Sequence, residues 1–277
     1  IHAPDGRLLA LVGRPGTGPG EFRHPRSAAV VPDGSFEVVD TRTRRLTRFG
    51  PDGALDTVIA FPEAMPTHLD YTGGRAVLGL RRPAGAEFGF LGRDGGFTPF
   101  HSWDPVLLAN RYWRNVAVDH VAGTVDGLLV AGSMQYPLWR YSADGAKRTP
   151  LGTPPPSWHE PTPMRPGPAD LRTTARWLRS FTVIAGVHAL ADGTVVVAHG
   201  RYNPRSDRRM TEIFRIHPYA VDVYGPGGRK LAEDVALPGP VLYADSLLYL
   251  QTAQPPDAWT VSRYRLRPAA LRTQAKR

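Results

Sequence analysis

The sequence predicts an all-β fold built from one repeated unit, and three observations support this prediction. The chain has 29 glycines and 28 prolines in 277 residues, a share that favours many short elements divided by turns. The dipeptide Asp-Gly recurs between short alternating or β-branched runs, which is a hairpin signal; it begins at Asp5, Asp33, Asp52, Asp94, Asp126, Asp144 and Asp192. Together with weaker turns at Gly73, Gly227 and Asp245, these turns form two strictly alternating series.

The alternating turns define a unit of four strands, a to d, with tight turns between strands a and b and between strands c and d. In the first full unit the strand-like runs are residues 27–31, 36–40, 46–49 and 55–61. The unit recurs about every 40 to 50 residues, which is the spacing of propeller blades. A four-stranded sheet of this kind buries both faces only by packing against its neighbours. The predicted fold is therefore a β-propeller of four-stranded antiparallel blades.

The first unit also resembles a known family. The segments that carry the resemblance are Val12-Gly13, residues 16–22, His24-Pro25, residues 28–31, Pro32-Asp33-Gly34, residues 36–40, Arg45-Leu46 and residues 49–53. Together they resemble an NHL repeat, and the chain is similar to the bacterial six-bladed, TolB-like β-propeller proteins, many of which are exported. The resemblance implies six blades in the intact protein, of which about five are visible in this sequence. The alternative is a five-bladed ring in which the N-terminal strand pairs with the last three strands.

Residues 1–267 are predicted to form one propeller domain, followed by a basic C-terminal tail at residues 268–277. No apolar run is long enough to span a membrane as a helix. The chain begins with Ile1, so we expect that the natural N-terminus lies further upstream. With the resemblance, this leads us to expect a periplasmic or extracellular protein. The absence of cysteine excludes disulfides and cysteine-based zinc sites.

The net charge of +9 could indicate a nucleic-acid partner, so its position matters. Six of the 34 basic residues follow the last acidic residue, Asp257, and the remaining 28 nearly balance the 25 acidic ones. This distribution disfavours nucleic acid, although the NHL resemblance keeps an RNA-binding propeller as a second alternative.

One face of the predicted blades carries all the long excursions. Turns between strands a and b and between c and d are short, whereas the b–c loops and the connections between blades include residues 102–114, 133–136, 153–180 and 201–211. Insertions on one face of a repeat array usually mark its binding surface. The Pro-rich insertion at 153–180 is expected to run extended and then to form a short helix over 169–180. Trp158 and Trp177 are expected to anchor it to the blades.

Catalytic motifs are absent from the sequence: there is no Gly-x-Ser-x-Gly elbow, zinc-protease helix, P-loop or EF-hand. We therefore expect a binding scaffold without a cofactor. The alternative is a metal-dependent lyase, lactonase or esterase with one zinc or calcium ion in the central channel. Its candidate ligands, at the starts of inner strands, are His24, His68 and Asn115, and they are weak because zinc needs three or four convergent ligands.

Arginines recur after strand b in different blades and point to a ligand. Arg42 and Arg44, Arg81 and Arg82, and Arg201 are each expected to follow that strand on the insertion-bearing face. Guanidinium groups suit carboxylates, phosphates and sulfates. The predicted partner is thus an anionic protein, peptide or glycan. The candidate ligand-binding residues are Arg42, Arg44, His68, Arg81, Arg114, Tyr136, Arg201 and Tyr202. Asp40, at the end of a strand, is expected to accept loop amides and to be structural.

Overall fold

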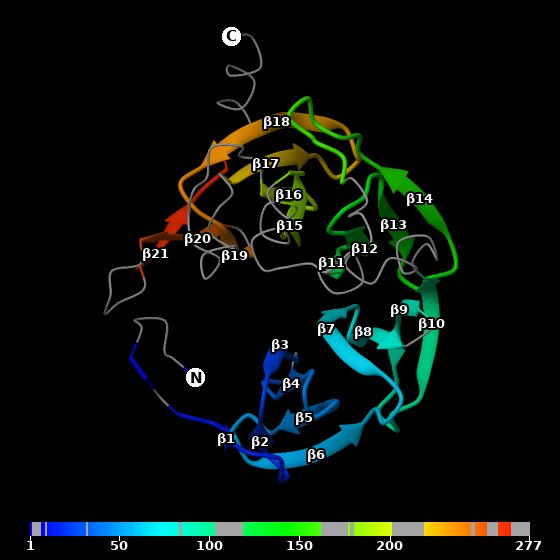
Figure 1. The fold of residues 1–277 in the computed structure, drawn as a ribbon, viewed down its shortest axis with the longest axis vertical. Coiled ribbons are helices and arrows are strands. Elements are labelled where there is room, and N and C mark those ends of the chain that lie inside the picture. The colour runs from blue at the N-terminus through cyan, green and yellow to red at the C-terminus, as the bar shows by residue number, and fades with distance from the viewer. Residues whose placement is uncertain are drawn as a thin grey trace. The chain divides into compact units, whose positions relative to one another are not determined.

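A computed structural model of the chain is all-β (Figure 1). It describes residues 1, 7–8, 10–31, 33–82, 85–102, 119–161, 177, 180–200, 219–244, 247–253 and 260–266. Most of the predicted helix at 169–180 lies outside these residues, although Trp177 is helical. In the described part of the chain, no helix is long and apolar enough to cross a membrane. The chain divides into two compact units, residues 1–114 and 115–277, which we describe separately.

Unit 1 contains two four-stranded antiparallel sheets and a short parallel pair. The pair joins β1 (Arg14–Pro15) to β2 (Glu21–Phe22). The first sheet consists of β3 (Pro25–Val30), β4 (Phe36–Asp40), β5 (Arg45–Phe49) and β6 (Leu55–Ala60). The second consists of β7 (Met65–Thr72), β8 (Arg75–Arg82), β9 (Gly85–Leu91) and β10 (Phe97–Ser102). In both sheets each strand pairs with the next one along the chain.

Unit 2 repeats the same topology. One sheet consists of β11 (Asp119–Thr124), β12 (Gly127–Gly132), β13 (Leu138–Ser142) and β14 (Arg148–Leu151). The next consists of β15 (Val183–Ala189), β16 (Val195–Gly200), β17 (Tyr219–Tyr224) and β18 (Lys230–Leu237). The described strands of the last sheet are β19 (Val241–Ala244), β20 (Leu248–Ala253) and β21 (Thr260–Tyr264).

These five sheets are the blades of a β-propeller, which confirms the predicted fold class. First strands of consecutive blades lie side by side within each unit, as β3 and β7 do in unit 1 and β11 and β15 in unit 2 (Figure 1). That is the arrangement of the inner strands of a propeller. Six blades in the intact protein and the mode of ring closure remain predictions.

The recurring turns have the physical basis that the sequence indicated. In three c–d turns an aspartate carboxylate accepts the backbone N–H two residues on: Asp52 from Ala54 at 3.0 Å, Asp94 from Gly96 at 2.9 Å and Asp144 from Ala146 at 3.0 Å. The glycine that follows each aspartate has a positive φ, which residues with a side chain rarely adopt. The same side-chain bond forms in a–b turns at Asp33 and Asp192.

The core of each unit lies between neighbouring blades. In unit 1, Val39 and Leu46 of the first blade share a buried cluster with Leu69, Leu78 and Leu80 of the second. In unit 2, residues of β12 and β13 share a cluster with Val195 and Val197 of β16. Within each unit, neighbouring blades thus cover an apolar face of one another, as repeat architectures require.

Candidate functional site

Asp40 organises the turn between β4 and β5 in the first blade. Its side chain is buried, with 1% exposed. One carboxylate oxygen, Oδ2, accepts the backbone N–H groups of Arg23 at 2.6 Å and His24 at 2.8 Å, and the other, Oδ1, accepts those of Arg42 and Thr43, both at 2.8 Å. A single carboxylate therefore joins the segment that enters β3 to the β4–β5 turn.

The charge of Asp40 is stabilised by the same contacts. Burial alone would raise the pKa of this carboxyl, but the four backbone N–H donors outweigh burial and hold its pKa below the ordinary value. Asp40 is therefore ionised at neutral pH. This confirms the expectation that it accepts loop amides and has a structural role.

A second contact holds the same two segments together. The backbone N–H of Thr41 donates to the carbonyl of His24 at 3.2 Å, and His24 Nδ1 lies 2.6 Å from the Thr41 hydroxyl. Both contacts fix where the side chains of this region leave the backbone.

Two open concavities adjoin this turn. The first, which we call the arginine concavity, has a volume of about 410 Å³ and is lined by Thr17, Arg23, Arg42, Thr43 and Arg45. The second, the Met65 concavity, has a volume of about 440 Å³ and is lined by Arg23, His24, Thr41, Arg42 and Met65. Arg23 and Arg42 contribute to both. The backbone N–H groups of these two arginines are two of the four that Asp40 accepts.

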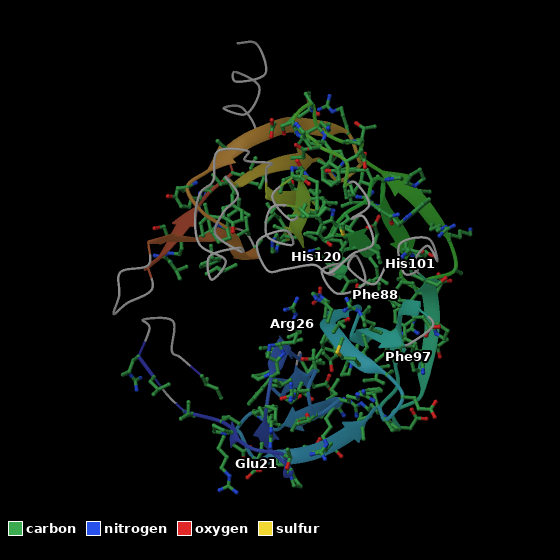
Figure 2. The ribbon with its side chains drawn as sticks, in the orientation of Figure 1. Glu21, Arg26, Phe88, Phe97, His101 and His120 are labelled. Carbon is green, nitrogen blue, oxygen red and sulfur yellow. The ribbon has the colours of Figure 1, made fainter. Side chains whose placement is uncertain are left out.

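Two arginine side chains of the arginine concavity have no partner in the described part of the chain. The guanidinium groups of Arg23 and Arg42 are exposed and form no ion pair or hydrogen bond with the side chains or backbone that the structure describes. Arg45 donates to the carbonyl of Thr17 at 2.6 Å and so fixes the linker that borders the concavity. Glu21 of the same linker, labelled in Figure 2, is engaged by Arg14 at 2.8 Å and by the Gly18 N–H at 2.8 Å.

Two arginines predicted for this site have other positions. Arg44 adopts a positive φ of 55° and donates to the carbonyl of Pro62 at 2.7 Å, and it does not line either concavity. Arg81 does not follow strand b as expected, because the pairing of β8 with β9 extends to Arg82. The prediction that Arg81 and Arg82 lie beyond the strand was therefore wrong. Arg82 forms an ion pair with Glu87 at 3.3 Å. Arg81 is nevertheless paired in register with Met65, at the Met65 concavity.

The candidate metal ligands do not form a site in the described part of the chain. His68 was predicted at the start of an inner strand and is the fourth residue of β7, and its ring contacts the Phe88 ring at 6.5 Å between centroids. Among the described residues, no three His, Asp or Glu side chains gather closely enough to hold a metal ion. Asn115 lies outside these residues, as do the predicted ligand-binding residues Arg114, Arg201 and Tyr202.

Tyr136 lies in unit 2 and its phenol group is engaged inside the protein. Its hydroxyl lies 2.7 Å from His199 Nε2, and its ring packs edge-on against Trp158 at 5.0 Å between centroids. Burial, followed by the nearby charge of Asp222, raises the pKa of Tyr136 well above its ordinary value. The ring is therefore only partly available to a ligand.

The Pro-rich insertion packs against unit 2 through Trp158, as predicted, whereas the anchoring of Trp177 to the blades stays a prediction. Trp158 packs against the core cluster of unit 2, and Trp177 is 8% exposed and contacts the Phe181 ring at 5.1 Å. The two ends are also joined directly, because the Thr182 N–H donates to the carbonyl of His159 at 3.0 Å. Residues 162–176 lie outside the described part.

A buried polar group in unit 2 was missed by sequence reasoning. Asp222 is fully buried in β17, where it accepts the N–H of Asp234 at 2.8 Å and lies 3.3 Å from Lys230 Nζ. Burial raises the pKa of Asp222, and burial with the neighbouring Asp222 charge raises the pKa of Tyr224 to about 12. The available signal was a lone acidic residue in the apolar strand sequence YAVDVY.

No protein-family model matches the sequence, and no curated protein matches it significantly. Among solved structures, the chain is similar to a member of the DUF4221 family from Bacteroides vulgatus, with a TM-score of 0.57 and 10% identity over 89% of this chain and 81% of the other. Virginiamycin B lyase from Staphylococcus aureus has a TM-score of 0.45 at 14% identity, over 88% and 66% of the two chains. A streptogramin B lyase has a TM-score of 0.47 at 11% identity, over 87% and 68%. The first likeness shows the fold alone, and it agrees with a β-propeller.

Proposed function

We propose that this protein is a non-catalytic binding propeller whose anionic partner, a protein, peptide or glycan, contacts the arginine concavity. The observation that carries the proposal is the pair of guanidinium groups of Arg23 and Arg42, which line both concavities and have no acidic partner among the described residues. By contrast, Arg48 of the same blade forms an ion pair with Glu37 on the neighbouring strand. Free guanidinium groups in a concavity are suited to an external anion.

The backbone beneath these arginines is held in place before any ligand arrives. Asp40 fixes the N–H groups of Arg23 and Arg42, and the His24–Thr41 contacts link the same segments. A site whose backbone is already ordered loses less conformational entropy on binding. The proposed activity needs no cofactor.

We also propose that the propeller is of the NHL or TolB-like type, with six blades in the intact protein, and that it is a bacterial protein exported to the periplasm or the cell exterior. The motif residues of the first blade support the subtype. The Gly-rich linker 13–20 is held by Glu21, and Asp40 accepts loop amides in the way that the resemblance implies.

The proposal is tested by retention on an immobilised polyanion, dextran sulfate. The double variant Arg23→Ala/Arg42→Ala removes both unpaired charges. A matched control, Arg26→Ala/Arg93→Ala, removes two exposed arginines of the same unit that line neither concavity. Charge-assisted hydrogen bonds contribute about 1.5 to 3 kcal/mol each, so the first variant should bind a partner at least tenfold more weakly and elute at lower salt.

The control separates a specific site from net charge. The control variant should elute close to the unaltered protein, and both variants should keep its melting temperature. Equal loss of retention in the two variants would show that only net charge matters, and the proposed site would then be wrong.

A further inference from the structure

The chemistry of the arginine concavity indicates what kind of anion it takes. Its side chains offer the guanidinium groups of Arg23, Arg42 and Arg45 and the hydroxyl groups of Thr17 and Thr43. None of the residues that line either concavity is an aspartate or glutamate. Guanidinium groups only donate hydrogen bonds, so the complementary group is one that mainly accepts them.

Thr43 provides an independent sign of a ligand. Its hydroxyl oxygen is buried and has no hydrogen-bond partner among the described residues. A buried polar group without a partner costs stability, and native proteins rarely leave one without a reason. Thr43 is one of the residues that line the arginine concavity, and we infer that a ligand oxygen bound between the arginines is the missing partner of this hydroxyl.

The net charge around the arginine concavity indicates how much negative charge its ligand carries. Three arginines line the concavity, and one ionised carboxylate, Asp40, lies beneath it and is committed to four backbone N–H groups. Glu21 on the linker is already engaged by Arg14. The lining therefore carries about two uncompensated positive charges, which a dianion balances.

We propose that the arginine concavity binds a phosphate monoester, with the phosphate between Arg23, Arg42 and Thr43 and the organic part towards Met65. This inference rests on the proposed function, because it specifies the anion that the same site takes. A phosphate monoester carries about two negative charges at neutral pH and three terminal acceptor oxygens. It therefore meets donors that come from separate chain segments better than a planar carboxylate, which has one charge and two oxygens. A sulfate monoester has the tetrahedral shape but only one charge. The neighbouring Met65 concavity, with Met65 and His24 in its lining, offers a less polar surface for the organic part.

Calorimetric titration of the full chain with three small ligands of similar size tests this inference. The ligands are phenyl phosphate, phenyl sulfate and benzoate at neutral pH, where only the first is a dianion. Phenyl phosphate should bind at least tenfold more tightly than the other two. Arg23→Ala/Arg42→Ala should remove its binding, and Arg26→Ala/Arg93→Ala should leave it unchanged.

Thr43→Val tests the hydroxyl with little change of shape. The N–H of residue 43 still reaches Asp40 in this variant, and the buried hydroxyl that is removed has no partner among the described residues, so the melting temperature should be unchanged or higher. Affinity for phenyl phosphate should fall about tenfold, because one hydrogen bond to a charged acceptor is lost. Unchanged affinity would overturn the assignment of Thr43.

The outcomes distinguish this inference from the function on which it rests. If Arg23→Ala/Arg42→Ala lowers retention on dextran sulfate but phenyl phosphate binds no better than phenyl sulfate, the site binds anions and the phosphate assignment is wrong. If that variant is retained like the control, the proposed function fails and the phosphate site fails with it.

Discussion

Replacing Asp40 by asparagine tests the part of the structure that shapes the candidate site. The carboxylate accepts four backbone N–H groups at 2.6 to 2.8 Å, two on each oxygen. Asparagine keeps one oxygen and places an NH₂ group against two of these donors. Two charge-assisted bonds at about 1.5 to 2 kcal/mol each are then lost, so Asp40→Asn should lower the free energy of unfolding by about 3 to 4 kcal/mol at neutral pH.

The pH dependence of this effect has a defined sign. The pKa of Asp40 is lowered in the folded protein, so its contribution is present above the unfolded pKa of about 3.9 and is lost as the pH falls through the folded value. The difference between Asp40→Asn and the unaltered protein should therefore shrink below about pH 4.

Urea unfolding at several pH values measures both quantities. Asp52→Asn is the matched control, because Asp52 is exposed and its carboxylate accepts one amide, that of Ala54. This control should change the free energy of unfolding by less than about 1 kcal/mol. An Asp40→Asn variant as stable as the control, or one whose deficit persists unchanged in acid, would refute the role assigned to Asp40.

Three further experiments test other parts of the fold. A Cβ at Gly127 would meet a backbone carbonyl of the facing strand at 2.0 Å, whereas one at Gly227 would meet nothing within 4 Å. In thermal unfolding, Gly127→Ala should therefore cost about 3 kcal/mol or more of stability, and Gly227→Ala less than about 0.5 kcal/mol. Equal effects of the two variants would contradict the β12 geometry. Burial raises the pKa of Asp222, so the stability that Asp222 contributes is lost as the pH rises through its pKa in the folded protein. Asp222→Asn should therefore flatten the dependence of the urea-measured stability on pH above about pH 4. An unchanged pH dependence would contradict the role of burial at Asp222. Tyr136→Phe removes the contact with His199 and should lower the free energy of unfolding in urea by about 1 to 2 kcal/mol. Retention on dextran sulfate should not change. Reduced retention would show that Tyr136 contacts the ligand.

Local signals in the sequence were sufficient for the fold. Asp-Gly pairs at fixed intervals specify turns through chemistry that involves only neighbouring residues, and the bonds of Asp52 and Asp94 to the amides two residues on show it. The position of Asp40 at the end of a strand indicated its structural role for the same reason. Because each of the first four blades has at least one Asp-Gly turn, one well-marked repeat predicts the others.

The composition of the candidate site could be predicted only in part, because it depends on contacts between distant segments. Arg42 was predicted from its place after strand b, but Arg23 lies 17 residues before the Asp40 carboxylate that positions it. Arg81 was assigned to a loop because the end of β8 depends on its pairing with β9. The carboxyl of Asp222 finds its partner Lys230 across β17 and β18, and no local pattern reports that pairing.

The central claim is that an anion binds between Arg23 and Arg42, and nitrogen-15 NMR during a titration with phenyl phosphate tests it most directly. If the claim is right, the largest saturable changes in chemical shift belong to the backbone amides of Arg23, Arg42 and Thr43. The chemical shifts of the Ala54 and Gly96 amides in the c–d turns should not change. Shifts spread over the basic tail at residues 268–277, or no saturable shift at the β4–β5 turn, would contradict it.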